Sequence, residues 1–237
     1  MSRLGAARFA QYAYPPNELG YCGPPGARAL LDADATRELE RRARHFEGAW
    51  SYLELIAEVV GVADPLDADV VDAYWIGSDL LDRVDPAVLV DRLTDRFRGQ
   101  GGGSWREAAA RAVPHHSFQV FEVYPWLGLL REGRPPGPAV WVLDRCRIRV
   151  GEVLAVAGEQ VRVSSRVLAW DGARLTDAGS ATETARWSVD RRALIDQPVV
   201  GALVALHWDW VCEEITPEQA ARIEQLERRT RAAAQAP

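Results

Sequence analysis

The side chains best suited to chemistry are three cysteines and an adjacent pair of histidines. Cys22, Cys146 and Cys212 are an odd number of thiols at wide spacing, which indicates reduced cysteines rather than a disulfide framework. Cys22 stands in a stretch rich in Gly and Pro, where packing seldom explains a thiol. With His115 and His116 it could form a metal site or a Cys–His nucleophile, and the spacing decides for neither.

Composition and motifs exclude several other chemistries. All 28 basic residues among the 237 are arginine, which excludes Schiff-base and P-loop lysine chemistry. The sequence also lacks the motifs of α/β-hydrolases, zinc metalloproteases, dinucleotide-binding folds and Cys-x-x-Cys sites. The net charge of −6 lacks the basic excess of a nucleic-acid binder. No apolar run suits a signal peptide or a spanning helix. We therefore expect a cytoplasmic protein that contacts neither nucleic acid nor membrane.

The N-terminal half has the pattern of helices. Four prolines and three glycines in residues 12–26 predict an irregular aromatic loop. Apolar residues then recur every three or four positions over residues 39–60, which predicts one helix. A second stripe covers residues 70–84, and Asp85 followed by Pro86 marks the start of a third helix.

The C-terminal half has the period of strands. Residues 145–150 alternate between arginine and apolar residues, as a half-buried strand requires. Further strand patterns cover residues 152–156, 160–168, 182–189 and 202–212. Thr216, Pro217 and Gln219 then form a capping box that starts a final helix.

These patterns predict an α+β protein with two domains. Residues 1–132 are expected to form an all-α domain that begins with the aromatic loop. Residues 133–138 are rich in Pro and Gly and are the predicted linker. Residues 139–237 are expected to form a small β-barrel with a C-terminal helix.

Aromatic residues near the predicted loops are candidates for a partner-binding surface. Tyr21 and Trp126, together with Tyr12 and Tyr14, could form such a patch. We favour the alternative, in which these rings pack the loop onto the helical domain.

Two segments of the C-terminal half resemble a known family. Cys146-Arg-Ile-Arg-Val-Gly-Glu-Val-Leu-Ala-Val is similar to the start of the HypC/HupF/HybG family of [NiFe]-hydrogenase maturation chaperones, Met-Cys-Leu-Ala-Ile-Pro-Gly-Lys-Val. Residues 200–215 contain His207 in Val-Gly-Ala-Leu-Val-Ala-Leu-His-Trp-Asp-Trp-Val. They look like that family's Val-Gly-Asp-Tyr-Val-Leu-Val-His-Val-Gly-Phe-Ala-Ile. The cysteine is internal here, whereas it is residue two in the family.

The resemblance implies an OB-like barrel, a metal site and protein partners. HypC-type proteins bind HypD and deliver an Fe(CO)(CN)₂ unit to the hydrogenase large-subunit precursor. Carried over to this sequence, the iron ligand is Cys146, and His207 lies near the same site. Thiolate is a suitable soft ligand for low-spin iron. Arg145 and Arg147 flank Cys146 and are expected to lower the pKa of its thiol.

The whole chain also resembles an uncharacterised actinobacterial family whose genes tend to lie near hydrogenase genes, through its Tyr-Cys-Gly-Pro and Pro-His-His-Ser-Phe segments. The leading hypothesis is therefore a HypC-like hydrogenase assembly factor whose partners are the large-subunit precursor or a HypD-like protein. One alternative is a protein-binding scaffold that carries no iron. Another is an enzyme that uses Cys22 with a nearby histidine, and OB-like barrels also suggest single-stranded nucleic acid.

Overall fold

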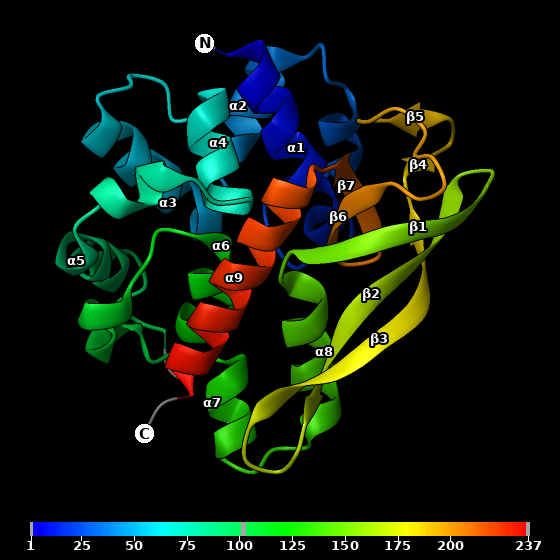
Figure 1. Ribbon diagram of the computed structural model, residues 1–237. Coiled ribbons are helices and arrows are strands. Elements are labelled where there is room, and N and C mark those ends of the chain that lie inside the picture. The colour runs from blue at the N-terminus through cyan, green and yellow to red at the C-terminus, as the bar shows by residue number, and fades with distance from the viewer. Residues whose placement is uncertain (1, 101–102, 236–237) are drawn as a thin grey trace.

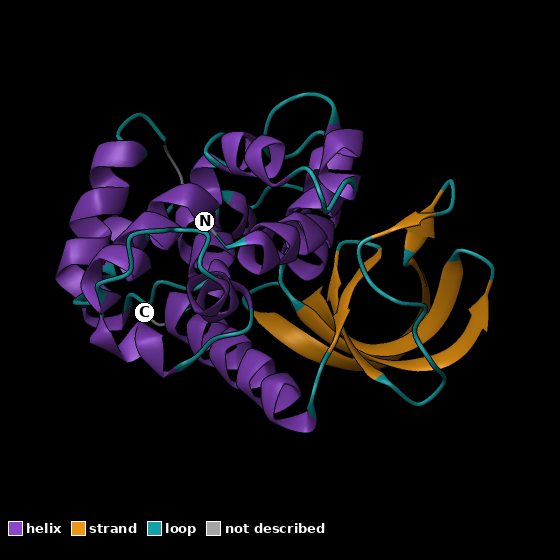
Figure 2. Ribbon diagram, turned by 90° about the horizontal axis from the view of Figure 1, so that it is seen from above, coloured by secondary structure: helices purple, strands orange, loops and turns teal. Residues whose placement is uncertain are grey.

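The computed structural model describes residues 2–100 and 103–235, and its helices and strands lie on opposite sides of the molecule (Figures 1 and 2). The α-helices are α1 (Arg3–Glu18), α2 (Thr36–Ala43), α3 (Glu47–Val60), α4 (Ala68–Trp75), α5 (Pro86–Arg96), α6 (His116–Phe118), α7 (Trp126–Arg131), α8 (Pro136–Cys146) and α9 (Pro217–Ala234). Shorter helical turns are η1 (Ala27–Leu31), η2 (Asp79–Arg83), η3 (Trp105–Glu107), η4 (Ala109–Arg111) and the π-helical turn η5 (Gln119–Val123). The strands are β1 (Arg149–Ala157), β2 (Gln160–Trp170), β3 (Leu175–Arg186), β4 (Ser188–Val189), β5 (Arg192–Ala193), β6 (Leu203–His207) and β7 (Trp210–Glu214). The protein is therefore α+β, as the sequence predicts.

Much of the N-terminal aromatic segment is helical and does not form the predicted loop. Residues 12–18 continue helix α1, which includes Pro15 and Pro16 in its last turn. Tyr12 and Tyr14 are buried, at 0% and 1% exposure, so their rings belong to the core and not to a surface patch. Burial of two aromatic rings stabilises a turn that the prolines alone would disfavour. The loop itself begins after α1 and covers residues 19–26.

The helices are shorter than the apolar stripes predict. The stripe over residues 39–60 is divided into α2 and α3, because residues 44–46 leave the helical path. The stripe over residues 70–84 is divided into α4 and η2 at Gly77, whose φ of 98° ends a helix naturally. Asp85 caps α5 through the amide of Ala87 and Pro86 opens it, as predicted.

The predicted linker and the predicted first strand are both wrong in part. Pro136 opens helix α8, which runs to Cys146, so residues 136–138 are helical and not a linker. Ala139, Val142, Leu143 and Cys146 are all buried at the i, i+3, i+4, i+7 spacing of a helix face. This stripe outweighs the short alternation over residues 145–150, and β1 begins only at Arg149.

The strands form a closed five-stranded sheet. Its order is β1-β2-β3-β7-β6, and β6 pairs back with β1. The long neighbours β1, β2 and β3 pair antiparallel, whereas β3 meets β7 in parallel. The predicted strand over residues 202–212 is a hairpin, because Trp208 and Asp209 form a two-residue turn between β6 and β7. Gly158 and Gly172 have positive φ in the turns that join β1 to β2 and β2 to β3.

Buried hydrophobic residues form three clusters. One fills the barrel interior, and a second packs α8 against α7 and the β2–β3 ribbon. The largest joins α1, α3 and α4 to β6, β7 and α9, so it crosses the boundary between residues 1–132 and 139–237. Helix α9, red-orange in Figure 1, lies against both halves. The division into two domains stays a prediction, but the interface between the halves is itself core.

Candidate metal site

Three predicted residues meet in the buried layer between the helices and the barrel. One ligand atom each from His116, Cys146 and His207 lies within 4.8 Å of the other two. The three side chains are 4%, 4% and 1% exposed. In a tetrahedral metal site, bonds of 2.0–2.3 Å place ligand atoms about 3.5 Å apart, so these donors would approach one another by about 1 Å to hold an ion.

Each donor is positioned by the end of a secondary-structure element. His115 caps α6 because its Nδ1 accepts a hydrogen bond from the Ser117 amide at 3.1 Å, and this directs the next ring, His116, to the other side. Cys146 is the last residue of α8, and His207 is the last residue of β6. These helix and strand ends bring side chains from distant segments of the sequence to one point.

The protein fixes which nitrogen of His207 faces the site. Its Nδ1–H donates to the Tyr12 carbonyl oxygen at 2.7 Å, so Nε2 carries the lone pair. That Nε2 is buried and has no hydrogen-bond partner among the described residues. Metal-binding histidines commonly donate their second ring nitrogen to a backbone carbonyl in this way.

The Tyr12 carbonyl is available because of the two prolines that follow it. In a helix this oxygen would accept from the amide of residue 16, or of residue 15 in a tighter turn. Pro15 and Pro16 have no N–H to donate. His207 replaces the missing donor, and the proline pair thereby orients the imidazole.

His116 is fixed in a similar way. Its Nε2–H donates to the Cys146 carbonyl oxygen at 2.7 Å, which leaves the lone pair on Nδ1. The Tyr74 hydroxyl lies 3.2 Å from this Nδ1 and donates to the Gly48 carbonyl oxygen at 2.9 Å. Since a hydroxyl has one hydrogen, the Nδ1 lone pair is free for a metal when Tyr74 donates to Gly48.

The site is uncharged in the absence of a ligand. Burial lowers the pKa of His116 to about 4 and that of His207 well below its ordinary value. Burial, with a smaller effect of Cys22, raises the pKa of the Cys146 thiol well above its usual range. The predicted lowering of that pKa by Arg145 and Arg147 is wrong, because these arginines pair with Glu183 and Asp144.

Cys22 lines the same cavity as the three donors. The cavity has a volume of about 30 Å³, which is enough for an ion or one to two water molecules and well below the range of small-molecule sites. The Cys22 Sγ lies 3.5 Å from the Tyr124 hydroxyl. Burial raises the pKa of this thiol, an effect that the Tyr124 hydrogen bond reduces. The two sites suggested by the sequence, Cys146 with His207 and Cys22 with a histidine, are therefore one cavity.

The other candidate residues lie elsewhere. The His115 ring is buried as the cap of α6, and burial with the neighbouring His116 lowers its pKa to about 3. Trp126 is partly buried against the α7–α8 cluster. Tyr21 is 47% exposed and stacks on Trp208 at 4.4 Å, with Trp141 beside them. Cys212 is fully buried in the core.

Sequence reasoning missed the residues around the donors. Tyr12, Tyr74, Trp75 and Tyr124 belong to this surround, and the Trp75 ring lies 4.6 Å from His116 and 5.6 Å from His207. Their spacing reads as ordinary core. The proline pair was a usable signal, since consecutive prolines within a helix free specific carbonyl groups.

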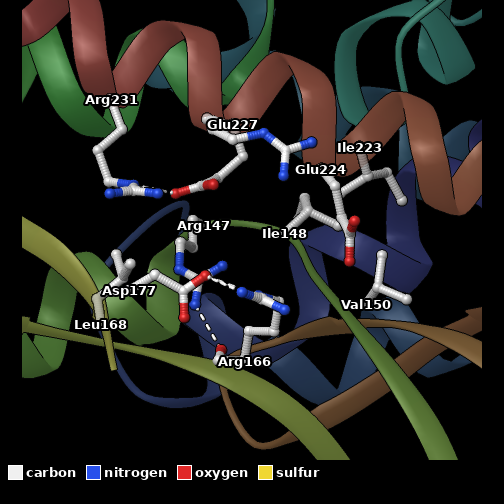
Figure 3. A pocket seen from close by; sticks show the side chains of 11 residues that line it. Arg147, Ile148, Val150, Arg166, Leu168, Asp177, Ile223, Glu224, Glu227 and Arg231 are labelled. Atoms are coloured by element: carbon white, nitrogen blue, oxygen red, sulfur yellow. Dashed lines mark hydrogen bonds and ion pairs between the residues drawn. The ribbon is translucent and has the colours of Figure 1, made fainter. Parts of the chain in front are cut away.

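A second cavity, between α9 and the barrel, is lined by charged residues, most of which are paired. Arg166 pairs with Asp177, and Arg231 pairs with Glu227 (Figure 3). Arg147 donates to the Arg166 carbonyl oxygen at 2.6 Å. Arg231 also donates to the Leu175 carbonyl oxygen at 2.9 Å and so fastens α9 to β3. With most of its charges paired, this cavity is a weaker candidate for a ligand site.

Comparison with known proteins places the chain in a family but assigns no activity. No curated protein and no solved structure matches it, and nothing links it to HypC-type proteins or to hydrogenase maturation. Among the described residues, no helix has both the length and the apolar content to cross a membrane. A family model matches residues 1–236, and the chain therefore belongs to the family of unknown function DUF6390.

Proposed function

We propose that this protein holds a transition-metal centre at His116, Cys146 and His207 and serves in metallocentre assembly. The observation that carries the proposal is the convergence of these donors, with the orphaned Nε2 of His207 at the cavity. A buried polar atom without a partner is costly. A metal ion would supply the missing partner.

The donor set favours a borderline or soft metal. One thiolate and two neutral imidazoles suit zinc, iron or copper better than magnesium or calcium. No carboxylate of the described residues lines the cavity. The thiolate would then be the only protein charge that offsets the ion, and a fourth position would stay open for another ligand.

The resemblance to HypC points to iron as cargo. Cys146 and His207 are the two residues that it assigns, and they lie together although Cys146 ends a helix and not a strand. The closed sheet with a parallel β3–β7 contact is compatible with an OB-like barrel, which is five-stranded. We therefore propose an Fe(CO)(CN)₂ unit as the cargo and a hydrogenase large-subunit precursor or HypD-like protein as the partner.

The first test is metal binding by the purified protein. We expect binding of one Co²⁺ or Fe²⁺ per chain by the native protein, and loss of binding in Cys146→Ala and His207→Ala. Cys212→Ala is the matched control, because this buried thiol lies outside the cavity. A native protein that binds neither ion would refute the metal site.

The second test addresses the cargo and the partner. Protein isolated from the native host should show infrared bands of iron-bound cyanide and carbonyl, which Cys146→Ala abolishes. A deletion strain should lose hydrogenase activity. Full hydrogenase activity in that strain, with no co-purifying hydrogenase protein, would rule out the hydrogenase role and leave another metal-handling function.

A further inference from the structure

We propose that Cys22 is a fourth, exchangeable ligand of the metal, and that residues 19–26 form the gate through which the metal enters and leaves. The inference rests on the proposed function. Cys22 lines the cavity with the other donors but is only partly buried, whereas the other three are 4% exposed or less. It is therefore the donor nearest to solvent.

Several polar contacts hold the gate loop, including a hydrogen bond from the Tyr21 amide to the Pro16 carbonyl oxygen at 2.9 Å and one from Arg42 to the Pro25 carbonyl oxygen at 2.9 Å. The Asn17 side-chain amide donates to the carbonyl oxygens of Cys22 at 2.7 Å and Pro24 at 2.8 Å. Gly23 has a φ of 79° and sits against the Phe46 ring, where an added Cβ would lie 2.4 Å from a ring carbon. The closed position of the loop is thus specific, and its opening breaks these hydrogen bonds and the contact with Phe46.

Contacts between neighbouring residues align the donors. Tyr21 stacks on Trp208 at 4.4 Å, and the Trp208 amide donates to the Arg145 carbonyl oxygen at 2.7 Å. These residues are the chain neighbours of Cys22, His207 and Cys146. Trp208 has a φ of 57°, a strained value for a residue that is not glycine. The surrounding contacts hold that conformation and thereby connect the loop to two donors.

The chemistry balances without an oxidant or a reductant. Binding of a divalent ion by Cys22 and Cys146 forms two metal–sulfur bonds and releases two protons to solvent. The resulting set of two thiolates and two imidazoles suits tetrahedral coordination. On transfer, the metal–sulfur bond of Cys22 breaks as an incoming ligand binds the metal, and the Cys22 thiolate takes up a proton.

The experiment is a Co²⁺ titration of the full chain, followed by the charge-transfer absorption of cobalt–thiolate bonds. The native protein should show two thiolate ligands. Cys22→Ala and Cys22→Ser should each keep one and lose about half of the charge-transfer intensity, and Cys212→Ala should keep all of it. A Cys22→Ser protein with native circular dichroism and an unchanged cobalt spectrum would overturn the proposal. Absence of any cobalt spectrum in the native protein would instead refute the metal site itself.

The gate is tested by the rate at which EDTA removes bound Co²⁺. Tyr21→Ala removes the stack on Trp208 and should accelerate removal about tenfold, in the range found for residues that orient ligands. Tyr21→Phe keeps the ring and should behave as the native protein does. Equal removal rates in all three proteins would show that the loop does not control access.

Discussion

At the scale of single residues, two prolines determine how a histidine 191 positions further along the chain is presented. Pro16 removes the amide that would bond the Tyr12 carbonyl, and His207 takes its place. The imidazole therefore presents Nε2 to the cavity. Stability does not explain the two prolines, because proline within a helix normally destabilises it.

Pro16→Ala tests this arrangement. The new amide competes with His207 Nδ1 for the Tyr12 carbonyl, so we expect Co²⁺ affinity to fall about tenfold while the helix itself is not weakened. Pro15→Ala is the matched control, since its amide would bond the Gln11 carbonyl instead. Titrations of the two variants by cobalt absorption distinguish the roles, and equal affinities would contradict the argument.

At the scale of elements, the signals that the sequence carries locally were reliable. The cap at Asp85 and the capping box at Thr216 are both present. These features depend on a few adjacent residues. The wrong predictions concern segments whose secondary structure depends on packing against distant parts of the chain. Helix α1 continues into its proline pair because its aromatic rings are buried. Helix α8 replaces a predicted strand because its apolar face packs on α7.

The convergence of the candidate site residues could not be predicted from the sequence either. Cys22, His116, Cys146 and His207 can each be singled out by type, but their convergence depends on how α6, α8, β6 and the gate loop pack. The sequence assigned them to two sites. The four residues meet only through tertiary packing, and the residues that pack around them have the sequence pattern of an ordinary hydrophobic core.

We expect the capping box at the start of α9 to stabilise the protein. The Thr216 hydroxyl accepts from the Gln219 amide at 3.2 Å, and the Gln219 side chain accepts from the Thr216 amide at 2.9 Å. Thr216→Ala should lower the free energy of unfolding by about 1 kcal/mol, measured by urea denaturation. Thr216→Ser keeps the hydroxyl and should lose much less. An equal loss in both variants would mean that the cap does not act through this hydrogen bond.

At the scale of the whole molecule, the proposed metal site lies at the junction of the two halves. His116 and Cys22 come from residues 1–132, whereas Cys146 and His207 come from residues 139–237. An ion bound by all four would link both halves. Binding would thus report whether they behave as one cooperative unit, as their shared hydrophobic cluster indicates.

Thermal unfolding with and without Co²⁺ therefore tests both the site and the organisation of the fold. We expect one transition, and free Co²⁺ at one hundred times its dissociation constant should raise the free energy of unfolding by about 2.7 kcal/mol. His207→Ala should unfold in one transition that Co²⁺ does not shift, because the site is incomplete. Two separate transitions, with only one of them moved by the metal, would show that the predicted helical domain and barrel fold independently. The ion would then be held by one half alone, and the convergence of donors across the boundary could not be the basis of binding.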